Sequence, residues 1–451
     1  MTSLVQELAE LAVRWRTEPL DEQIAHATTR VVVDWMAATL AGVPLGAPGL
    51  LTAVVAERRS AGGARLATTG ASVDPCSAAL VNGTAAHVAE LDDIYRDGLY
   101  HPGAPTIAAA LALLEDSDGS GEELVRAVIA GFEVGCRLAA AVNPTHYVYW
   151  HTTGTVGTLG AAAAGAVALG LGAEGVAHAL ATAATMAAGL QQAFRSDAMS
   201  KPLHSGRAAE GGTLAALAAK AGVTGALDVL EGEAGFFAAM STRAGLETVL
   251  ADPGRAPCVT RPTVKSHSCC GHAFAPVDGA LELRAGGLDW NDVAAVKVET
   301  YAAALKVAGI ADPRSPFEAK FSIPYCVASA LVRGGVRLSA FTEEACADAD
   351  VRAVMGRVHL SVEPDLDAHY PQQRAARLTA VCRDGRRLVS ERSTRKGDPD
   401  DPLSDAELWA KFSDLTGAQL GASGAADLLG QLRHLPDVKR LRDMAWTGHI
   451  S

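Results

Sequence analysis

The chain has 451 residues, of which 49% are hydrophobic and 20% charged, and its formal net charge is −12 at pH 7. This composition is typical of a globular protein with a large core and more than one domain. The negative charge argues against nucleic acid or an anionic membrane as the main partner. The most apolar region, 155–190, is rich in Ala and Gly and is broken by Gly170-Leu-Gly172 and Glu174, so it does not indicate a membrane span.

The N-terminus and the cysteines indicate a cytoplasmic protein. Residues Met1–Glu7 have neither the basic start nor the apolar core of a signal peptide. The eight cysteines lie mostly in apolar stretches, such as those around Cys136 and Cys326. We interpret them as reduced thiols rather than as a disulfide framework.

The first part of the chain, up to about residue 260, is predicted to be helical. An apolar run over 108–114 stops at Asp116-Ser-Asp-Gly119, and Ser120-Gly-Glu-Glu123 is a capping box for a helix over 124–142. Gly170-Leu-Gly-Ala-Glu-Gly175 matches the dinucleotide-binding pattern, but it follows an Ala-rich helix rather than a strand, so it predicts a helix–helix turn. Two runs of small residues would let helices approach closely, 161–165 and 179–188.

After Pro262 the pattern changes to strands interspersed with helices. Alternation predicts strands at 296–300 and 358–362, and 377–382 with 387–390 form a β-hairpin around the tight turn Asp384-Gly385. Helical patterns lie between these strands, at 276–284, 323–333 and 343–355. This region is therefore predicted to be an α+β domain.

The C-terminal part is expected to return to the helical domain. Lys396-Gly-Asp-Pro-Asp-Asp-Pro402 is interpreted as a linker, and Ser404-Asp-Ala-Glu407 then caps a further helix. The predicted fold class is mostly α with a smaller α+β domain. The predicted domains are an all-helical one of residues 1–262 plus 403–451, and an α+β one of residues 263–402 with its hairpin at 377–390.

Four polar clusters stand out in this aliphatic chain. Lys265-Ser-His-Ser-Cys-Cys-Gly-His272 packs one cation, two imidazoles and two thiols into eight residues. The other three are Glu90-Leu-Asp-Asp93 with His101-Pro102, Tyr149-Trp-His151, and Lys201-Pro-Leu-His204-Ser-Gly-Arg207. A core cannot bury four such clusters unless their polar groups are paired, whereas a site for a charged small molecule can use them all.

Purely structural interpretations of these clusters stay open. Lys265–His272 could be an exposed loop, Tyr149–His151 a plug in the core, Glu90–Asp93 a solvated helix end, and Lys201–Arg207 a basic helix start on the surface. Tyr325 is balanced between a core tyrosine and a site residue. A zinc site is disfavoured because His267, Cys269, Cys270 and His272 lack the spacing of a Cys-x2-Cys site.

The chain resembles the MmgE/PrpD family, from about Gln6 into the C-terminal tail. The resemblance is carried by residues 89–94, 101–105, 150–155, 201–206, 230–237, 269–272 and 319–325. The family includes 2-methylcitrate dehydratase, cis-aconitate decarboxylase and iminodisuccinate epimerase. The resemblance implies a large helical domain, a smaller α+β domain, a homodimer, an active site in the cleft between the domains, and no metal or organic cofactor.

The reactions of this family act on small polycarboxylates, so they need cations to hold carboxylates and an acid and a base to move protons. By resemblance, Asp93 and Glu90 orient partners, and Tyr325 donates a hydrogen bond or a proton. The catalytic candidates are His101, His151, Asp93, Tyr325, Cys270 and His272. The substrate-binding candidates are Lys201, Lys265, Glu90, His204, Arg207 and His267, of which His204 and Arg207 are expected to be supporting residues.

Departures from the family pattern rank the reactions. Glu90 stands where relatives commonly have Asp, and Ile94 where they often have Thr. Cys270 stands where the decarboxylase branch places a catalytic-site His, so decarboxylation of cis-aconitate is the least favoured of the three reactions, and Cys270 or His272 would be the substitute acid or base.

Three functions are therefore compared. We expect a lyase similar to 2-methylcitrate dehydratase, with an isomerase similar to iminodisuccinate epimerase as the alternative. The third is a scaffold or binding protein without turnover. The retained Lys201, Lys265, His101 and His151 argue against the scaffold, which has no use for so many ionisable groups.

Overall fold

The structure is a computed structural model that describes residues 2–58, 60–194, 198–242, 245–251 and 256–447. It divides into two compact units, one of residues 1–264 with 404–451 and one of residues 265–403. We call them the helical unit and the mixed unit and describe each by itself. The first boundary predicted from the sequence, after residue 262, lies shortly before the one in the structure.

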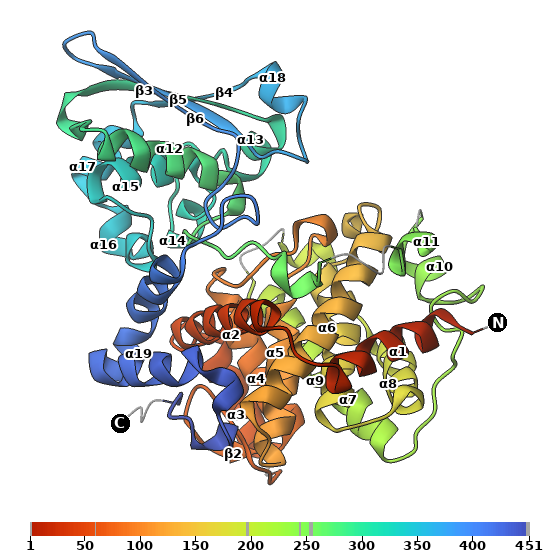
Figure 1. The fold of residues 1–451 in the computed structure, drawn as a ribbon. Helices are drawn as coiled ribbons and strands as arrows, with labels where there is room; N and C mark the ends of the chain where they lie inside the picture. Colours follow the sequence, from red (N-terminus) through yellow and green to blue (C-terminus); the bar gives the residue numbers. More distant parts are fainter. Residues whose placement is uncertain (1, 59, 195–197, 243–244, 252–255, 448–451) are drawn as a thin grey trace. The chain divides into compact units, whose positions relative to one another are not determined.

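The described part of the helical unit consists almost entirely of helices (Figure 1). They are α1 Leu4–Thr17, α2 Glu22–Gly42, α3 Ala47–Arg58, α4 Pro75–Val88, α5 Gly103–Asp116, α6 Gly121–Val142, α7 Thr152–Ala168, α8 Ala173–Met186, α9 Ser200–Lys220, α10 Phe236–Met240, α11 Leu246–Val249 and α19 Asp405–Arg433. The predicted mostly helical fold class is confirmed. One correction is needed: β1 Ala64–Arg65 and β2 Ser72–Val73 pair antiparallel, so this unit is not all-helical.

Helix α7 is the centre of the helical unit and packs against α5, α6, α8 and α9. Small residues make this packing possible: a Cβ added at Gly212 of α9 would lie 2.5 Å from the Cβ of Ala161 in α7. The predicted capping box before α6 is present, with Ser120 and Glu123 each accepting from the other's backbone N–H. The turn between α7 and α8 occupies the glycine-rich segment that matched the dinucleotide pattern, so that segment is a helix–helix turn, as predicted.

The chain returns to the helical unit through α19, which packs on α2. Its N-terminus has the predicted capping box of Ser404 and Glu407. The buried Lys411 of α19 donates to Asp34 of α2 at 2.5 Å and to the carbonyl of Leu91 at 3.1 Å. The second bond anchors the loop that follows α4, and this loop carries most of the acidic candidates.

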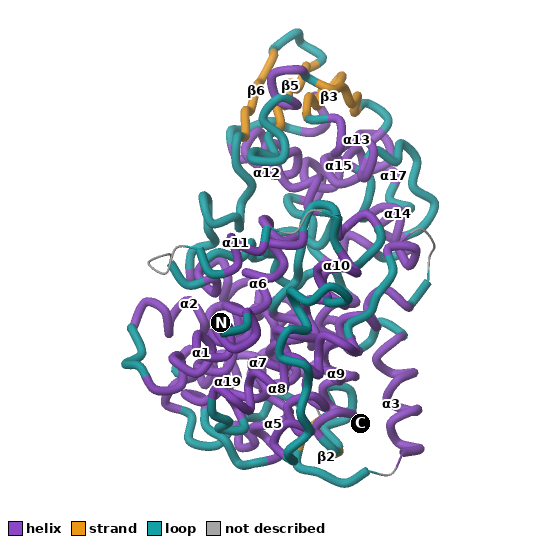
Figure 2. The backbone as a smooth tube through the Cα atoms, turned by 90° about the vertical axis from the view of Figure 1, so that its right-hand side faces the viewer, coloured by secondary structure: helices purple, strands orange, loops and turns teal. Residues whose placement is uncertain are grey.

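The mixed unit contains a four-stranded sheet with its helices gathered on one face (Figures 1 and 2). The strand order is β4-β3-β5-β6, with β3 parallel to β4 and antiparallel to β5, and β5 antiparallel to β6. The strands are β3 Val293–Thr300, β4 Val358–Val362, β5 Ala376–Cys382 and β6 Arg387–Arg392, and the helices are α12 Phe274–Ala285, α13 Ala302–Ala308, α14 Pro316–Ala319, α15 Ile323–Arg333, α16 Glu343–Cys346, α17 Ala349–Met355 and α18 Pro364–Asp367. Helix α12 packs on β5 and β6, and α15 packs on β4.

The predicted strands, the hairpin and two of the three helices of this region are confirmed, but the helix expected over 343–355 is wrong. The structure breaks it into α16 and α17 because Asp348 leaves the helical path and caps α17, accepting from the N–H groups of Asp350 and Val351. The predicted linker at 396–402 has no helix or strand, yet Asp398 is buried, so its first part belongs to the packed mixed unit.

Within the described residues, no single helix is long and apolar enough to cross a membrane. Helices α2 and α3 reach the length and composition only when taken together, and this pair bends by 85°.

Candidate active site

The polar residues of the helical unit meet where three segments converge: the end of α4 with the loop over 89–102, the start of α7, and the first turns of α9. The loop turns sharply at Glu90, whose φ is 60°. Backbone hydrogen bonds then fix its path, because Ile94 pairs with Thr263 in both directions and Tyr95 pairs with Tyr100. The N–H of His101 donates to Thr153 Oγ1 of α7 at 3.2 Å, which joins the end of the loop to that helix.

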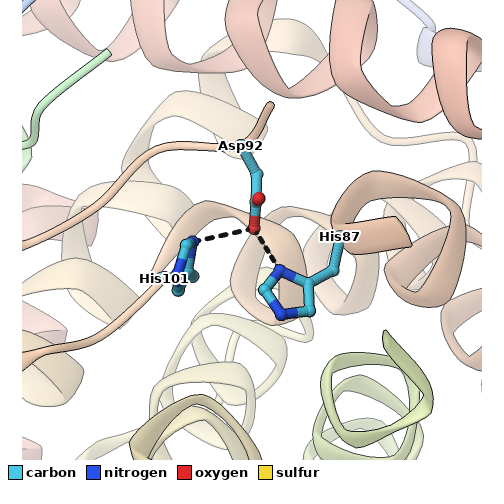
Figure 3. Close-up of side chains that lie close together, drawn as sticks. All are labelled: His87, Asp92 and His101. Carbon is cyan, nitrogen blue, oxygen red and sulfur yellow. Dashed lines mark hydrogen bonds and ion pairs between the residues drawn. The ribbon is translucent and has the colours of Figure 1, made fainter. Parts of the chain in front are cut away.

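Asp92 lies between two imidazoles at the centre of this cluster (Figure 3). Its Oδ2 is 2.7 Å from Nδ1 of His87 and 3.2 Å from Nδ1 of His101. His87 and Asp92 are buried, whereas the His101 side chain is 14% exposed. One carboxylate oxygen therefore holds two histidines that come from different segments.

The charge state of Asp92 fixes the tautomers of both histidines. Burial alone would raise the pKa of Asp92, but the neighbouring His87 and His101 hold it well below its usual range. Because the carboxylate is ionised, it can only accept, so Nδ1 of His87, which bonds to it, carries a proton, and the 3.2 Å approach of Nδ1 of His101 favours a proton there as well. The remaining ring nitrogen, Nε2, is then a base in the neutral imidazole and an acid in the charged one.

Asp93 behaves differently although it is the next residue. Burial raises its pKa well above the usual range, and the carboxylates of Asp92 and Asp34 raise it further. Its Oδ1 accepts from the N–H of Gly103 at 3.0 Å, at the start of α5. Asp93 therefore ties the loop to α5 with a carboxyl whose pKa is raised, whereas the pKa of its neighbour Asp92 is lowered.

His151 and His204 extend the cluster toward α9. Their Nδ1 atoms lie 3.1 Å apart, so one ring donates to the other, and the His151 ring stacks on His87 with centroids 5.6 Å apart. Burial lowers the pKa of His204 to about 4, with further contributions from His87 and Lys201. Burial also lowers the pKa of His151 well below its ordinary value, and the neighbouring cationic groups add to this effect. Both rings are thus neutral at pH 7.

A glycine makes room for this pair. Gly189 has a φ of 143°, and a Cβ added there would lie 3.3 Å from the His204 ring. The carbonyl of Gly189 also accepts from the N–H of His151 at 2.9 Å. The backbone at this point therefore contacts both histidines closely, which a larger residue would prevent.

Lys201 provides the cation of the cluster. Its Nζ forms an ion pair with Oε1 of Glu90 and lies 5.0 Å from the centroid of the Phe194 ring. Both charged side chains are about one-fifth exposed, at 22% for Lys201 and 21% for Glu90. Glu90 thus holds the ammonium group in place while part of it can still meet a ligand.

His87, Asp92 and His101 are also the residues that could hold a metal ion. Each offers one ligand atom, and the three atoms lie within 4.8 Å of one another. Two imidazoles and a carboxylate suit a transition metal such as Zn²⁺. The same geometry is equally satisfied by the hydrogen bond from His87 and the ion pair with His101, which need no metal ion.

The mixed unit holds four of the predicted candidates in the segment 265–272. Lys265 is buried, and Nε2 of His267 is 2.7 Å from Oδ1 of Asp278 in α12. The N–H of Cys270 donates to the carbonyl of Lys320 at 2.9 Å. Nδ1 of His272 is 2.8 Å from the Tyr301 hydroxyl, and burial, together with two nearby arginines, lowers the pKa of His272 to about 3. At neutral pH, His272 is therefore uncharged and a poor base.

Two predicted site residues lie in other surroundings. Tyr325 is fully buried in α15, where its hydroxyl donates to the carbonyl of Ala340 and burial raises its pKa. This environment favours the core interpretation that the sequence left open. Arg207 forms an ion pair with Glu210 and has a 58% exposed side chain, so the structure does not bring it into the histidine cluster.

Sequence reasoning did not single out His87 or Asp92, which lie at the centre of the cluster. Asp92 was quoted only as part of the acidic segment beside Asp93. A usable signal existed in the spacing: a histidine in the last turn of a helix, five residues before an acid and fourteen before His101, can fold back onto that acid when the intervening segment turns. Glu90, with its positive φ, is the residue where it turns.

Comparison with known proteins agrees with this arrangement of two units. The model of the MmgE/PrpD N-terminal domain matches residues 6–249, and that of the MmgE/PrpD C-terminal domain matches residues 267–430. Similar proteins include the cis-aconitate decarboxylases of Homo sapiens, 28% identical over 384 residues that cover 81% of this chain and 77% of that protein, and of Aspergillus terreus, 23% identical over 471 residues that cover 98% and 96%. The enzyme of the same name from Mus musculus is 26% identical over 381 residues, covering 81% of this chain and 76% of its own length. The chain belongs to the MmgE/PrpD family.

Proposed function

We propose that the protein is a lyase that acts on a small tricarboxylate by acid–base chemistry at the histidine cluster of the helical unit. The observation that carries this proposal is the approach of His87 and His101 to one ionised carboxylate, Asp92, which bonds to His87 and forms an ion pair with His101, while Lys201 lies near His151 and His204 of the same cluster. Relatives named cis-aconitate decarboxylase support the lyase class and the tricarboxylate.

The cluster can supply each part of such a reaction. His101 is partly exposed, so it can reach a ligand, and the nearby Asp92 favours its Nε2 as the nitrogen that takes or gives the proton. Positioned acid–base catalysis of this kind is worth about 10²–10⁴-fold in rate. Lys201 would bind a carboxylate and stabilise the negative charge that develops on it when an adjacent carbon loses a proton or carbon dioxide.

Two lyase reactions fit this machinery. In dehydration, a base removes the proton next to a carboxylate and the hydroxyl leaves as water, as in 2-methylcitrate dehydratase. In decarboxylation, cis-aconitate loses carbon dioxide and a proton returns to carbon, which gives itaconate. The similar proteins favour decarboxylation, which the sequence ranked last. The thiol of Cys270, at the position of a histidine in the decarboxylase branch, argues against decarboxylation and, less strongly, against dehydration. We therefore propose cis-aconitate as the first substrate to test and 2-methylcitrate as the second.

The deciding experiment is proton NMR of the full chain incubated with cis-aconitate, 2-methylcitrate, citrate and iminodisuccinate in separate tubes. Itaconate formed from cis-aconitate identifies the decarboxylase, and an unsaturated product from 2-methylcitrate or citrate identifies the dehydratase. Deuterium from heavy water appearing in recovered iminodisuccinate would instead identify an epimerase. No conversion in any tube would refute the lyase and leave the scaffold interpretation.

We also propose that turnover needs no added metal or organic cofactor and that the enzyme is a homodimer, the second on family resemblance alone. Activity lost to a chelator and restored by one metal would overturn the first proposal, and the metal would then belong at His87, Asp92 and His101. A monomer mass by light scattering at micromolar protein would overturn the second.

A further inference from the structure

A second cationic cluster lies in the mixed unit, around Arg374 in the segment that leads into β5. In β5, Ala376 pairs with Thr300 at the end of β3, and the Thr300 hydroxyl donates to the carbonyl of Ala375 at 2.8 Å. This pairing lays Arg374 alongside the residues that follow β3. The first of them is Tyr301, with which the guanidinium interacts electrostatically.

Aromatic rings and an imidazole build the surroundings of this arginine. Tyr301 and Tyr370 stack with their ring centroids 4.6 Å apart and their planes 14° apart. His272 lies beside both rings and bonds to the Tyr301 hydroxyl at 2.8 Å. Tyr301 is buried to 1% exposure, whereas His272 and Tyr370 are partly exposed, so these packed rings hold their polar groups beside the arginine.

The charges of this cluster do not balance. Arg395 is neutralised, because its Nε and Nη2 donate to the two oxygens of Asp398 at 2.9 and 2.7 Å. His272 is uncharged at neutral pH, since burial and the two arginines lower its pKa to about 3. Arg374 forms no ion pair with any residue that the structure describes, and its Nε is buried with no hydrogen-bond acceptor there.

An arginine cannot relieve such a position by losing its proton. Desolvation of the partly exposed Arg374 and the proximity of Arg395 lower its pKa, Tyr301, Tyr370 and Asp398 partly offset this, and the ordinary value is so high that the group stays charged. A buried donor without an acceptor and a cation without a counter-ion both cost free energy, so cationic groups in this state are normally paired with an anion. The planar fork of a guanidinium matches the two oxygens of a carboxylate.

We propose that Arg374, with His272, Tyr301 and Tyr370 around it, forms a binding site for the carboxylate group of a small anionic ligand within the mixed unit. The ligand carboxylate would balance the positive charge of Arg374. It would also accept a hydrogen bond from the buried Nε–H of this arginine. Tyr301 can donate to Nδ1 of His272, which leaves the His272 proton on Nε2 as a further donor to the anion. The site needs no contribution from the histidine cluster of the helical unit.

The test is binding of propane-1,2,3-tricarboxylate, which has the charges of a tricarboxylate substrate without its reactive bond, to the full-length protein. Calorimetry should give a Kd that rises about 10–100-fold in Arg374→Gln, because one charge-assisted bidentate contact is lost. Arg374→Lys should fall between the two, since a lysine keeps the charge but not the fork. Arg377→Gln is the matched control: Arg377 lies three residues further along, in β5, is paired with Glu391 and Asp365, and should leave the Kd unchanged.

A second readout assigns the effect to this residue. In nitrogen-15 NMR, the Nε–H resonance that disappears in Arg374→Lys should shift when the tricarboxylate is added to the wild-type protein. An unchanged Kd in Arg374→Gln, an equal loss in Arg377→Gln, or an unshifted Nε–H signal at saturating ligand would each overturn the site. Inorganic phosphate binding as tightly as the tricarboxylate, with the same dependence on Arg374, would overturn its assignment to carboxylates.

Failure of this site and failure of the proposed function are distinguishable. Binding that depends on Arg374, without turnover of any tricarboxylate, would support the site and refute the lyase. Turnover of a tricarboxylate, with neither Kd nor KM altered in Arg374→Gln, would support the lyase and refute the Arg374 site.

Discussion

Replacing Asp92 by Asn tests the central feature of the candidate active site. The carboxylate accepts through Oδ2 from Nδ1 of His87, and the same oxygen lies 3.2 Å from Nδ1 of His101. An amide of the same shape has one accepting oxygen and one donating NH2 group. The amide cannot accept from both imidazoles as the carboxylate oxygen does. At least one imidazole therefore either loses its partner or moves its proton from Nδ1 to Nε2.

The expected loss follows from what Asp92 holds in place. An imidazole with its proton on Nε2 cannot accept a proton there, so the acid–base contribution of about 10²–10⁴-fold is lost from kcat. That range corresponds to about 3–5 kcal/mol of transition-state stabilisation. KM should change little because Lys201, rather than Asp92, is the proposed carboxylate ligand.

Steady-state kinetics on the substrate identified by NMR would measure this loss, and nitrogen-15 shifts of the histidine rings would report the change of tautomer. Glu133→Gln is the control for removing a buried charged acceptor, since Glu133 is 2% exposed and pairs with Arg137 at 2.9 Å in α6, away from the cluster. It should lower stability but keep kcat. A folded Asp92→Asn enzyme with wild-type kcat and unchanged ring tautomers would refute the role of Asp92.

Three further outcomes are expected. His101→Ala should lower kcat by about 10²–10⁴-fold with nearly unchanged melting temperature; a large loss of melting temperature instead would make His101 structural. Lys201→Met should raise KM by roughly 10–100-fold with a smaller effect on kcat, because a charge-assisted contact to the substrate is lost. KM should also depend less on salt concentration in the variant than in the wild type, and an equal salt dependence would contradict the role of Lys201. The folded-state pKa of His204, about 4, lies below its ordinary value of 6.5, so only the unfolded chain binds this proton between those values. The contribution of neutral His204 to the free energy of unfolding is therefore fully present above pH ~6.5 and is lost as the pH falls toward ~4. Below that pH, His204 causes no further change in the free energy of unfolding. Urea denaturation across this range should show a weaker pH dependence in His204→Gln, and identical slopes would disprove the assignment.

Local sequence patterns determined the elements of both units. The capping boxes at Ser120 and Ser404 could be predicted because a cap joins residues three positions apart. The hairpin of β5 and β6 could be predicted because the Asp384-Gly385 turn is also a local pattern. The interruption at Asp348 was missed because the apolar spacing continues through it, and only the cap of α17 marks the break.

The sequence predicted only some of the residues of the candidate site. The polar clusters of the sequence contain His101, His151, Lys201 and His204, and the structure brings these four residues together in the helical unit. Residue type and spacing could not say that the pKa of Asp92 is lowered and the pKa of Asp93 is raised. That difference arises from burial beside Asp34 and from the two imidazoles that fold onto Asp92.

The sequence by itself therefore determined the fold class, the main strands and the family, and most of the helices that it was used to predict, because these depend on periodicity, caps and turns within a few residues. Tertiary structure alone decided which ionisable groups share a partner. His87 joins His101 through Asp92 only because the loop turns at Glu90, and Tyr325 becomes a core residue only because the carbonyl of Ala340 lies against its hydroxyl. Arg374 likewise becomes an unbalanced cation only when β5 lays it beside Tyr301. Charge and hydrogen bonding act over a few ångströms in space, and no local pattern encodes which distant residues will come within that range.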